Sequence, residues 1–421
     1  MRILFCNHEY PPLGGGGGVF NAFLAEESAK RHEVTVLTSG SRGLVREERQ
    51  GRLRILRVPT LVPRQRASAG VPWLAAYLLA ARLAGARYVA ASAYDVINTQ
   101  FVLPAGPVGD ALARHSGTPN VLTLHGGDLF DPSKWTSPHR HAVLRFWIRR
   151  LLRRATAVVA QSTDTIENVR QFYDAALPVE RIPLGVRQPP VGVADRAAFG
   201  FEQSDSLLVT LGRLVPRKAV DRLIAIFTRT ERLTARLLIL GTGPEESALR
   251  RQASMGGAAE RIHFFGHVSD VDKFHILRMS DVFVSTSQHE GFGLMFLEAM
   301  ICGLPVVCYD CGGQTDFLET DRTGFVLKLN DENKFLAACE ALMRDRNLRS
   351  NFGATNRRHA VGLTIEACAR GYEALFERAR YRRTEPKTAS GPSSLRPGSA
   401  STSTQPESAV RSPSPPSAAE R

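Results

Sequence analysis

Short runs of apolar and β-branched residues alternate along the chain with segments whose apolar residues recur at helical spacing. The segment Val19–Arg31 is one such helical pattern. This alternation is typical of parallel β-α-β units, in which each strand is followed by a helix that returns over the sheet. The runs that predict strands in the first half are Ile3–Cys6, Glu33–Thr38, Leu53–Val58, Val96–Thr99, Val121–Leu124 and Ala157–Ala160.

The pattern weakens at residues 188–205, where two prolines and two glycines interrupt it, and then restarts. This segment predicts a linker between two α/β domains of similar size, which we place at residues 1–187 and 206–363. The strands predicted for the second domain are Leu207–Leu211, Leu237–Leu240, His263–Phe265, Val282–Ser285, Val306–Tyr309 and Phe325–Leu327.

The C-terminal part of the chain predicts one further helix and then a tail. Residues 364–381 carry a single apolar stripe at helical spacing. From residue 382 to residue 421, serine, proline, alanine and threonine dominate, and large apolar residues are scarce. We predict that this tail is disordered, because it cannot bury enough apolar surface to offset its ordering entropy.

Charge and cysteine content narrow the class of protein. The formal net charge of +13 favours anionic ligands in general: phosphate groups, nucleic acid or lipid. The six cysteines are scattered, and the one Cys308-x-x-Cys311 pair has no second ligand pair, so we expect no zinc site. The apolar stretch at residues 71–93 contains Arg82 and Arg87 and predicts an amphipathic helix rather than a membrane span. We expect a cytoplasmic protein, either free or peripheral on the inner face of the membrane.

The loop Pro11–Gly18 follows the first predicted strand and opens the first predicted helix. Ligands of open parallel sheets bind at the carboxyl ends of strands, and helix N-termini favour phosphate. The run of five glycines is not a G-x-G-x-x-G fingerprint, and no acidic residue clearly ends the second strand, so a nicotinamide site is not supported. The loop indicates a phosphate or sugar contact, with a merely flexible loop as the alternative.

The loop Gly212–Lys218 places three cations, Arg213, Arg217 and Lys218, directly after the first strand of the second domain. Arginine can bind a diphosphate through two parallel hydrogen bonds, while lysine acts as a point charge. The alternative is a solvated basic turn.

The segment Glu290–Glu298 follows a predicted strand and runs into an apolar helical pattern. Glu290 falls in the loop, and Glu298 falls about one turn into the helix. Helical positions eight residues apart point about 80° apart, so the two carboxylates are expected to make separate contacts. The alternative for Glu298 is an exposed helix face, although its apolar neighbours favour burial.

Four blocks of the sequence together resemble the retaining glycosyltransferases called family 4: Pro11–Val19, Gly212–Lys218, Leu240–Pro244 and Glu290–Met300. The resemblance implies an α/β protein of the GT-B fold, with two Rossmann-like domains that face each other across a cleft. The first domain would bind the acceptor and the second the donor, and the helix at residues 364–381 would pack back on the first domain.

The resemblance also implies how a nucleotide diphosphate-sugar would be held. Arg213 and Lys218 would bind the diphosphate, Glu290 the donor sugar and Glu298 the ribose. The remaining donor contacts that it implies are the backbone amides of Phe292, Gly293 and Leu294, the glycines Gly17 and Gly18 of the first domain, and Val268 beside the base.

His125, in the block Thr123–Asp128, resembles the family's histidine at a strand end. The resemblance places it near the anomeric carbon, so that the implied catalytic residues are His125, Glu290, Arg213 and Lys218. A hydrogen-bonded core histidine is the alternative. We expect a reaction with retention of configuration, without a metal or other cofactor, and we expect Lys218→Ala to abolish it while the protein stays folded.

Three positions depart from the family's pattern, and one segment suggests other chemistry. Ala219 stands where the family often has glycine, and Leu184 and Arg187 stand where asparagine and aspartate are frequent. The segment Asp270–Asp272 spells a D-x-D, the metal motif of a different transferase fold, but here we expect it to begin a helix.

Two other functions remain open from the sequence. One is a different enzyme on the same fold, such as a nucleotide-sugar epimerase or a phosphorylase. The other is a non-catalytic protein that binds nucleotide-sugar or membrane. Residues 139–154 interleave arginines with large apolar residues, which indicates either a basic amphipathic helix on an anionic membrane or a helix packed inside and solvated outside. No aromatic stacking platform accompanies the arginines, so nucleic acid is not expected.

The acceptor is expected to be a glycan or a lipid-linked saccharide, and the donor to be linked to UDP or GDP. The sequence does not identify either more closely. The first-domain loops that would hold the acceptor are Pro59–Pro72, Pro104–Asp110 and Phe130–Pro138.

Overall fold

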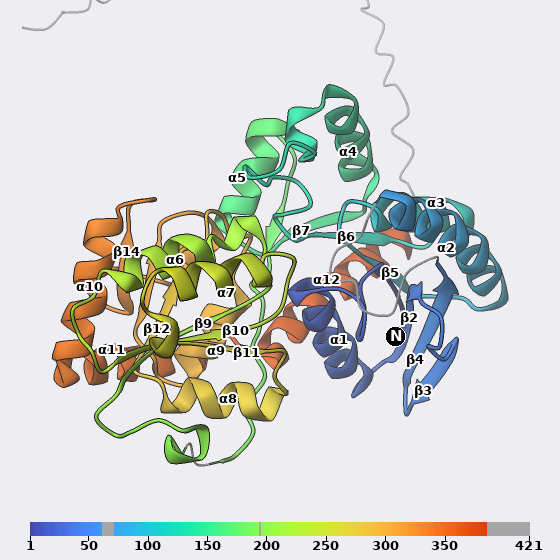
Figure 1. The fold of residues 1–421 in the computed structure, drawn as a ribbon. Helices are drawn as coiled ribbons and strands as arrows, with labels where there is room; N and C mark the ends of the chain where they lie inside the picture. The colour runs from blue at the N-terminus through green and yellow to red at the C-terminus, as the bar shows by residue number, and fades with distance from the viewer. Residues whose placement is uncertain (61–70, 193–194, 385–421) are drawn as a thin grey trace, which may run out of the picture. The chain divides into compact units, whose positions relative to one another are not determined.

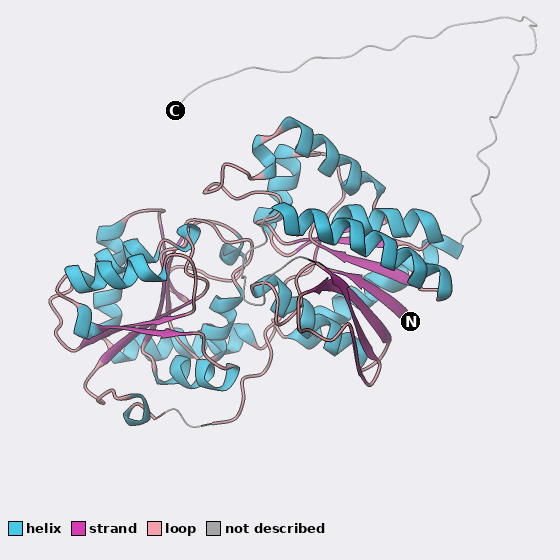
Figure 2. Ribbon diagram, turned by 45° about the vertical axis from the view of Figure 1, so that its right-hand side comes forward, coloured by secondary structure: helices cyan, strands magenta, loops and turns pink. Residues whose placement is uncertain are grey.

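The computed structural model describes residues 1–60, 71–192 and 195–384, which form two α/β lobes. Each lobe has a mainly parallel sheet with helices on both faces (Figures 1 and 2). The expected α/β architecture with two Rossmann-like domains is therefore confirmed. The loop predicted at Pro59–Pro72 lies for the most part outside the described residues, as does the predicted tail from residue 385 onward.

The first sheet has the strand order β3-β4-β2-β1-β5-β6-β7-β8, and only the β3–β4 pair is antiparallel. The order reverses direction between β1 and β5, which is the position where open α/β sheets bind ligands. The strands are β1 Arg2–Cys6, β2 Glu33–Gly40, β3 Glu47–Gln50, β4 Leu53–Pro59, β5 Val96–Gln100, β6 Asn120–Leu124, β7 Ala157–Ala160 and β8 Glu180–Arg181. The helices are α1 Gly16–Ala29, α2 Val71–Ala91, α3 Ala105–Ser116, α4 Ala142–Arg154 and α5 Thr163–Phe172.

Alternate side chains of β1 bury themselves against opposite layers of helices. Ile3 and Phe5 pack in one apolar cluster with α1, while Leu4 and Cys6 pack in another with α2 and α3. A strand with helices on both faces must be apolar at every position, and this explains why β1 reads as a continuous apolar run.

The second sheet has the order β11-β10-β9-β12-β13-β14 and is parallel throughout the pairs described. Its strands are β9 Ser206–Leu211, β10 Ala235–Leu240, β11 Ile262–Gly266, β12 Val282–Ser285, β13 Val306–Tyr309 and β14 Gly324–Leu327. Its helices are α6 Val220–Thr228, α7 Glu246–Met255, α8 Asp270–Met279, α9 Leu294–Ile301, α10 Glu332–Arg344 and α11 Arg346–Ala360. The order reverses between β9 and β12, so the loops after these strands lie at the corresponding ligand-binding position.

The helix α12 (Ile365–Thr384) follows the second lobe in sequence but packs on the first. It lies beside α1 (Figure 1), and the hydroxyl of Tyr372 donates to Oγ1 of Thr123 in β6 at 3.2 Å. Arg31 at the end of α1 pairs with Glu373 at 2.8 Å. Residues 382–384 belong to this helix, so the start of the predicted tail at residue 382 was wrong by three residues.

Two short strands were not predicted. β3 has the sequence Glu-Glu-Arg-Gln and is largely exposed, and β8 has two exposed residues, so neither produces an apolar run. The predicted linker is also not featureless. In its described part, Phe201 is buried and Arg196 pairs with Asp281 of the second lobe at 3.0 Å.

Candidate functional site

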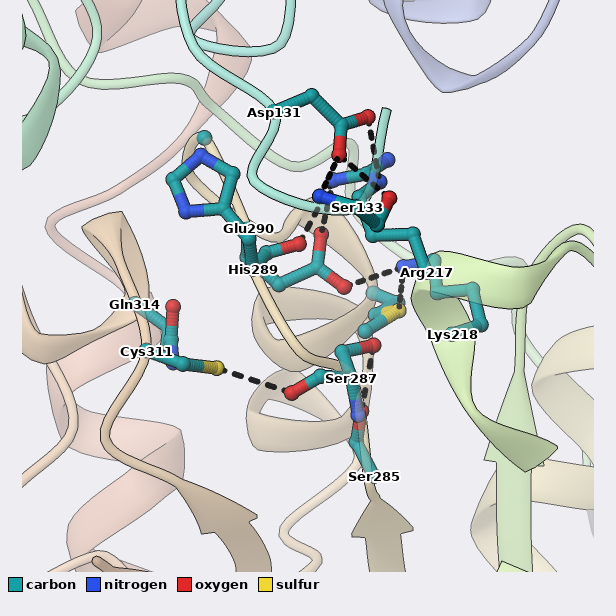
Figure 3. A network of polar contacts seen from close by, with 12 residues as sticks. Asp131, Ser133, Arg217, Lys218, Ser285, Ser287, His289, Glu290, Cys311 and Gln314 are labelled. Carbon is teal, nitrogen blue, oxygen red and sulfur yellow. Dashed lines mark hydrogen bonds and ion pairs between the residues drawn. The ribbon is translucent and has the colours of Figure 1, made fainter. Parts of the chain in front are cut away.

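Loops after β9 and β12 bring a lysine and a glutamate together, although they are 72 residues apart in sequence. The 3-10 turn Pro216–Lys218 follows β9, and Glu290 lies between β12 and α9. Nζ of Lys218 donates to Oε1 of Glu290 at 2.5 Å, and both side chains are largely buried (Figure 3). The structure therefore joins two of the predicted site residues in one buried ion pair.

Opposing effects set the protonation of this pair. Burial raises the pKa of Glu290, but the charges of Lys218 and Arg217 outweigh burial, so the pKa is lowered and the carboxylate is ionised. Burial lowers the pKa of Lys218, and the charge of Glu290 opposes that effect. Because each charge is desolvated, each depends on the other for its stability in the folded protein.

Arg217 links this pair to the first lobe. It donates to the backbone carbonyl of His289 at 2.7 Å, and it lies 3.8 Å from Glu290 and 3.7 Å from Asp131. Asp131 is buried and also pairs with Lys134 at 3.1 Å. Figure 3 shows the Lys218 and Arg217 side chains near Glu290, with Asp131 beside Arg217. The loop Phe130–Pro138, predicted to hold the acceptor, thus reaches the ion pair through Asp131.

The glycine run meets the second lobe at Gly15. A Cβ on Gly15 would lie 3.2 Å from Nε of Arg213, so only a glycine backbone allows this approach without displacement. The run is partly helical, since α1 begins at Gly16. Gly17 lies against the ring of Phe101, and Gly18 packs on Glu9.

The resemblance implies that Gly17 and Gly18 contact the donor diphosphate, and this stays a prediction. The glycine next to Arg213 is Gly15, and the open face of the run is at Gly16, where an added Cβ would meet nothing within 4 Å. Arg213, Lys218 and Gly212 line one small pocket at the carboxyl ends of β9 and β10. The N-terminus of α1 and the predicted diphosphate ligands therefore lie together.

Glu298 makes a second buried ion pair, separate from that of Glu290. It lies in the second turn of α9, is 8% exposed, and accepts a hydrogen bond from Nζ of Lys273 at 2.7 Å. Lys273 lies in α8 and also pairs with Asp270 at 2.9 Å. Burial raises the pKa of Glu298, while Lys273 partly offsets that rise. The alternative of an exposed helix face is wrong.

His125 follows β6 and is held between two glutamines at neighbouring strand ends. Nε2 of Gln161, after β7, lies 2.6 Å from Nδ1, and Oε1 of Gln100, at the end of β5, lies 2.8 Å from Nε2. Since Gln161 donates and Gln100 accepts, these contacts assign a neutral ring that carries its proton on Nε2. Burial lowers the pKa of His125 to about 3. The ring of Phe101 stacks on the imidazole ring, with 3.9 Å between the ring centroids.

Of the remaining predicted donor contacts, Phe292, Gly293 and Leu294 lie at the start of α9, whereas Val268 follows β11. Gly293 has φ +89° and precedes the first helical residue, Leu294, so free amides of the first turn face the site. Phe292 is buried and packs against Phe317. Val268, after β11, is partly buried in the core that includes α8 and α9.

The two lobes contact each other beside the start of α9. A Cβ on Gly126 would lie 2.6 Å from Cα of Gly291, and Oγ of Ser162 donates to the carbonyl of Gly291 at 2.7 Å. The histidine block of the first lobe and the glutamate block of the second are therefore in direct backbone contact.

The D-x-D segment begins α8, as expected. The hydroxyl of Ser269 caps the helix by accepting from the amide of Asp272, and Asp270 pairs with Lys273. Among the described residues, no cluster of histidine, cysteine, aspartate or glutamate has the arrangement of a metal site. In the same part of the chain, none of the helices has the length and apolar character needed to cross a bilayer.

Sequence reasoning missed four residues that shape the site: Gln100, Gln161, Asp131 and Lys273. The first two are the polar residues that end or follow apolar strand runs, and this signal could have identified them. Asp131 and Lys273 also have local ion-pair partners, Lys134 and Asp270, but their contacts with the site residues Arg217 and Glu298 come from distant parts of the chain, and no local pattern predicts these contacts.

Comparisons with known proteins agree with this fold. The family model described as Glycosyltransferase Family 4 matches residues 14–187, and the model described as Glycosyl transferases group 1 matches residues 194–359. Sucrose-phosphate synthase from Thermosynechococcus elongatus has a similar fold, with a TM-score of 0.78 and 21% identity over 90% of this chain and 99% of that chain.

Two curated relatives are mannosyltransferases. The GDP-mannose-dependent alpha-(1-6)-phosphatidylinositol monomannoside mannosyltransferase of Mycolicibacterium smegmatis is 26% identical over 85% of this chain and 94% of its own length. The GDP-mannose-dependent monoacylated alpha-(1-6)-phosphatidylinositol monomannoside mannosyltransferase of Corynebacterium glutamicum is 30% identical over 47% of this chain, and the match spans 55% of that relative.

The fold, the paired loops and these matches define the class of protein: it is an enzyme, a glycosyltransferase. Within that class the chain belongs to the GT-B glycosyltransferases, built from the two domain families whose models it matches in order.

Proposed function

We propose that the enzyme transfers a sugar from a UDP- or GDP-linked donor to a glycan or lipid-linked saccharide, with retention of configuration at the anomeric carbon. The observation that carries this proposal is the buried pair of Lys218 and Glu290 beside Arg213 and the start of α1. The two mannosyltransferase relatives support GDP-mannose as the first donor to test.

In the proposed complex, Arg213 and Lys218 bind the diphosphate, and the free amides at the starts of α1 and α9 add hydrogen bonds to it. Glu290 accepts hydrogen bonds from hydroxyls of the donor sugar, and Glu298 from the ribose. Lys218 would then contact both the donor phosphate and Glu290, so the pair couples recognition of the sugar to recognition of its leaving group.

In the proposed reaction, the bond from the anomeric carbon to the phosphate oxygen breaks, and the acceptor oxygen bonds to that carbon on the same face. The acceptor proton goes to the departing phosphate oxygen. Lys218 and Arg213 stabilise the charge that develops on that oxygen. His125 is neutral and both its nitrogens are hydrogen-bonded to glutamine side chains, which argues against a role as base. No metal is needed for charge neutralisation in this scheme.

The direct test is a transfer assay with radiolabelled GDP-mannose, UDP-glucose and UDP-N-acetylglucosamine, with short glycans or extracted lipids as acceptors. The expected product is a glycoside whose anomeric proton coupling matches that of the donor. Release or isomerisation of the sugar without any acceptor product would favour the nucleotide-sugar epimerase, which the comparisons do not favour. Inversion at the anomeric carbon would contradict the proposed mechanism.

The matched control for the site is Lys334, an exposed lysine of α10 whose side chain is 74% accessible. Lys218→Ala is expected to abolish transfer, and Lys334→Ala to leave it unchanged. Equal activity of both variants would remove the diphosphate role from Lys218.

We also propose that the enzyme meets a lipid-linked acceptor as a peripheral protein at the inner face of an anionic membrane. The names of the two mannosyltransferase relatives, whose acceptors are phosphatidylinositol derivatives, support this setting.

A further inference from the structure

The helix α4 is apolar on two opposite faces. One face, with Ile148, Leu151 and Leu152, is buried against the first lobe. On the other face, Val143, Phe146 and Trp147 are 68%, 65% and 55% exposed. Both interpretations of this helix from the sequence assumed one apolar face. The structure shows a second apolar face, which is exposed to solvent.

Exposed arginines lie beside and within the exposed apolar face. Positions three and four residues apart lie on one side of a helix, so Val143, Phe146 and Trp147 form a stripe that continues to Arg150. The arginines of α4 are Arg145, Arg149, Arg150, Arg153 and Arg154, all exposed. Residues 132–154 contain no aspartate or glutamate.

Acidic groups from the elements packed beside α4 engage only part of this charge. Arg153 pairs with Asp174 at 2.7 Å, and Arg154 with Asp110 at 3.3 Å. Both pairs lie toward the C-terminal end of the helix. Among the described residues, no carboxylate forms an ion pair with Arg145 or Arg150. The positive charge beside Phe146 and Trp147 is therefore not balanced locally.

The loop before α4 carries an exposed tryptophan close to the start of the helix. Trp135 is 77% exposed, and its carbonyl lies 2.9 Å from Nε2 of His141, the residue that precedes the helix. The same loop begins at Asp131, which lies 3.7 Å from Arg217 in the candidate site. Only four positions therefore separate a residue of the site from an exposed aromatic ring.

We propose that Trp135, Val143, Phe146 and Trp147, with Arg145 and Arg150, form a docking surface for an anionic lipid membrane. Aromatic rings bury well at the level of lipid headgroups, and arginines beside them bind phosphate while their stems stay in apolar surroundings. An anionic lipid surface is negatively charged over a wide area. It therefore complements residues 132–154, which contain arginines but no aspartate or glutamate. The inference rests on the proposed function only in that it brings a lipid-linked acceptor beside Asp131.

The test uses the full chain and vesicles of phosphatidylcholine with or without about one third phosphatidylglycerol, at ~0.05 M and ~0.5 M salt. The variant Phe146→Ser/Trp147→Ser removes the exposed rings. Its control, Leu79→Ser/Leu83→Ser, removes two exposed apolar side chains of α2, each 64% exposed. Thermal denaturation of both variants checks that they fold.

We expect co-sedimentation that needs phosphatidylglycerol, weakens at high salt, and falls at least about tenfold in the α4 variant but not in the α2 control. Arg145→Gln/Arg150→Gln should lower binding and its salt dependence together. Absence of binding to anionic vesicles, or equal loss in both serine variants, would overturn the proposal. So would a loss of self-association in the α4 variant without a loss of vesicle binding, because the surface would then join two copies of the chain.

Tryptophan fluorescence gives a second readout, which compares the native chain with two single tryptophan variants. The chain has three tryptophans: Trp135 and Trp147 belong to the proposed surface, and Trp73 is buried. Brominated lipids should quench the first two, as judged by Trp135→Phe and Trp147→Phe, and leave Trp73 unaffected. Quenching that these substitutions do not reduce would contradict the proposed surface.

The experiments distinguish a failure of the docking proposal from a failure of the proposed reaction. Lys218→Met should keep full vesicle binding, and the α4 variant should keep transfer to a water-soluble acceptor. Loss of transfer by an enzyme that still binds vesicles concerns the proposed reaction. Loss of vesicle binding by an active enzyme concerns the docking surface.

Discussion

Lys218 donates a hydrogen bond to Glu290 at 2.5 Å. This contact joins two loops of the candidate site that are 72 residues apart in sequence. Both groups are charged and largely buried. Removal of one member of a buried pair costs about 3–5 kcal/mol, because the remaining charge has no partner.

We predict that Lys218→Met abolishes transfer and also lowers the free energy of unfolding by about 3 kcal/mol. The expectation from sequence alone, that Lys218→Ala affects only activity, is thereby refined. The double variant Lys218→Met/Glu290→Gln should regain most of the stability and none of the activity. Urea denaturation and the transfer assay measure the two effects, and a double variant as unstable as Lys218→Met would show that the pair is not the cause.

The ion pair of Lys273 and Glu298 leads to a prediction about donor affinity. Glu298 is already shifted toward protonation by burial, so Lys273→Met should raise its pKa further. A neutral carboxyl accepts hydrogen bonds less well. The KM for the donor should therefore rise about tenfold near neutral pH, and more as the pH falls, while kcat changes little.

Lys273→Arg, which restores a cation, should recover most of the donor affinity, and Lys334→Met is the control on an exposed helix. Donor KM measured between about pH 5.5 and 8 tests this point. A KM that is unchanged in Lys273→Met at every pH would show that Lys273 does not maintain the charge of Glu298.

The pattern of apolar positions predicted nearly every strand of both sheets, because strands covered on both faces must be apolar throughout. It missed β3 and β8, whose exposed residues need no such pattern. The structure places Arg213, Lys218 and Glu290 in loops that follow strands, and Glu298 in the helix after such a loop, as the pattern predicted. Lys273, the partner of Glu298, and Asp131, which lies beside Arg217, are brought in by tertiary packing, which local sequence does not encode.

His125 gives a prediction about stability and pH. Burial lowers its pKa to about 3 in the folded protein, compared with an ordinary value of 6.5. The neutral ring must therefore gain a proton when the protein unfolds below pH 6.5. Above pH 6.5 this titration does not lower the free energy of unfolding. As the pH falls from 6.5 toward 3, it lowers the free energy of unfolding by about 1.4 kcal/mol per pH unit.

The variant His125→Gln lacks this titration. Its free energy of unfolding should fall less steeply than that of the native protein between about pH 6.5 and 4, in urea titrations at several pH values. Parallel pH profiles for the two proteins would mean that His125 is not held neutral in the fold.

Ala219 provides a prediction about backbone strain. It follows Lys218 and has φ +45° and ψ +43°, a left-handed conformation that costs an L-residue about 1 kcal/mol or more. Thr286 donates to its carbonyl at 2.8 Å and helps to hold it there. This conformation is the physical reason for a glycine at the same place in the family that the sequence resembles.

Ala219→Gly should therefore raise the free energy of unfolding by about 1 kcal/mol. Ala338→Gly, in the interior of α10, should lower it by a similar amount, since glycine weakens a regular helix. Denaturation of both variants makes the comparison. A loss of stability in Ala219→Gly as large as in Ala338→Gly would exclude strain at this position.

The central claim is that Arg213 and Lys218 recognise the second phosphate of a nucleotide diphosphate. Calorimetric titration of GDP against GMP, and of UDP against UMP, measures this directly in the native protein and in Arg213→Ala. We expect one diphosphate to bind at least about tenfold more tightly than its monophosphate, and this difference to shrink by about tenfold or more in the variant. A native protein that binds the monophosphate as tightly as the diphosphate, or a variant that keeps the full difference, would contradict the claim.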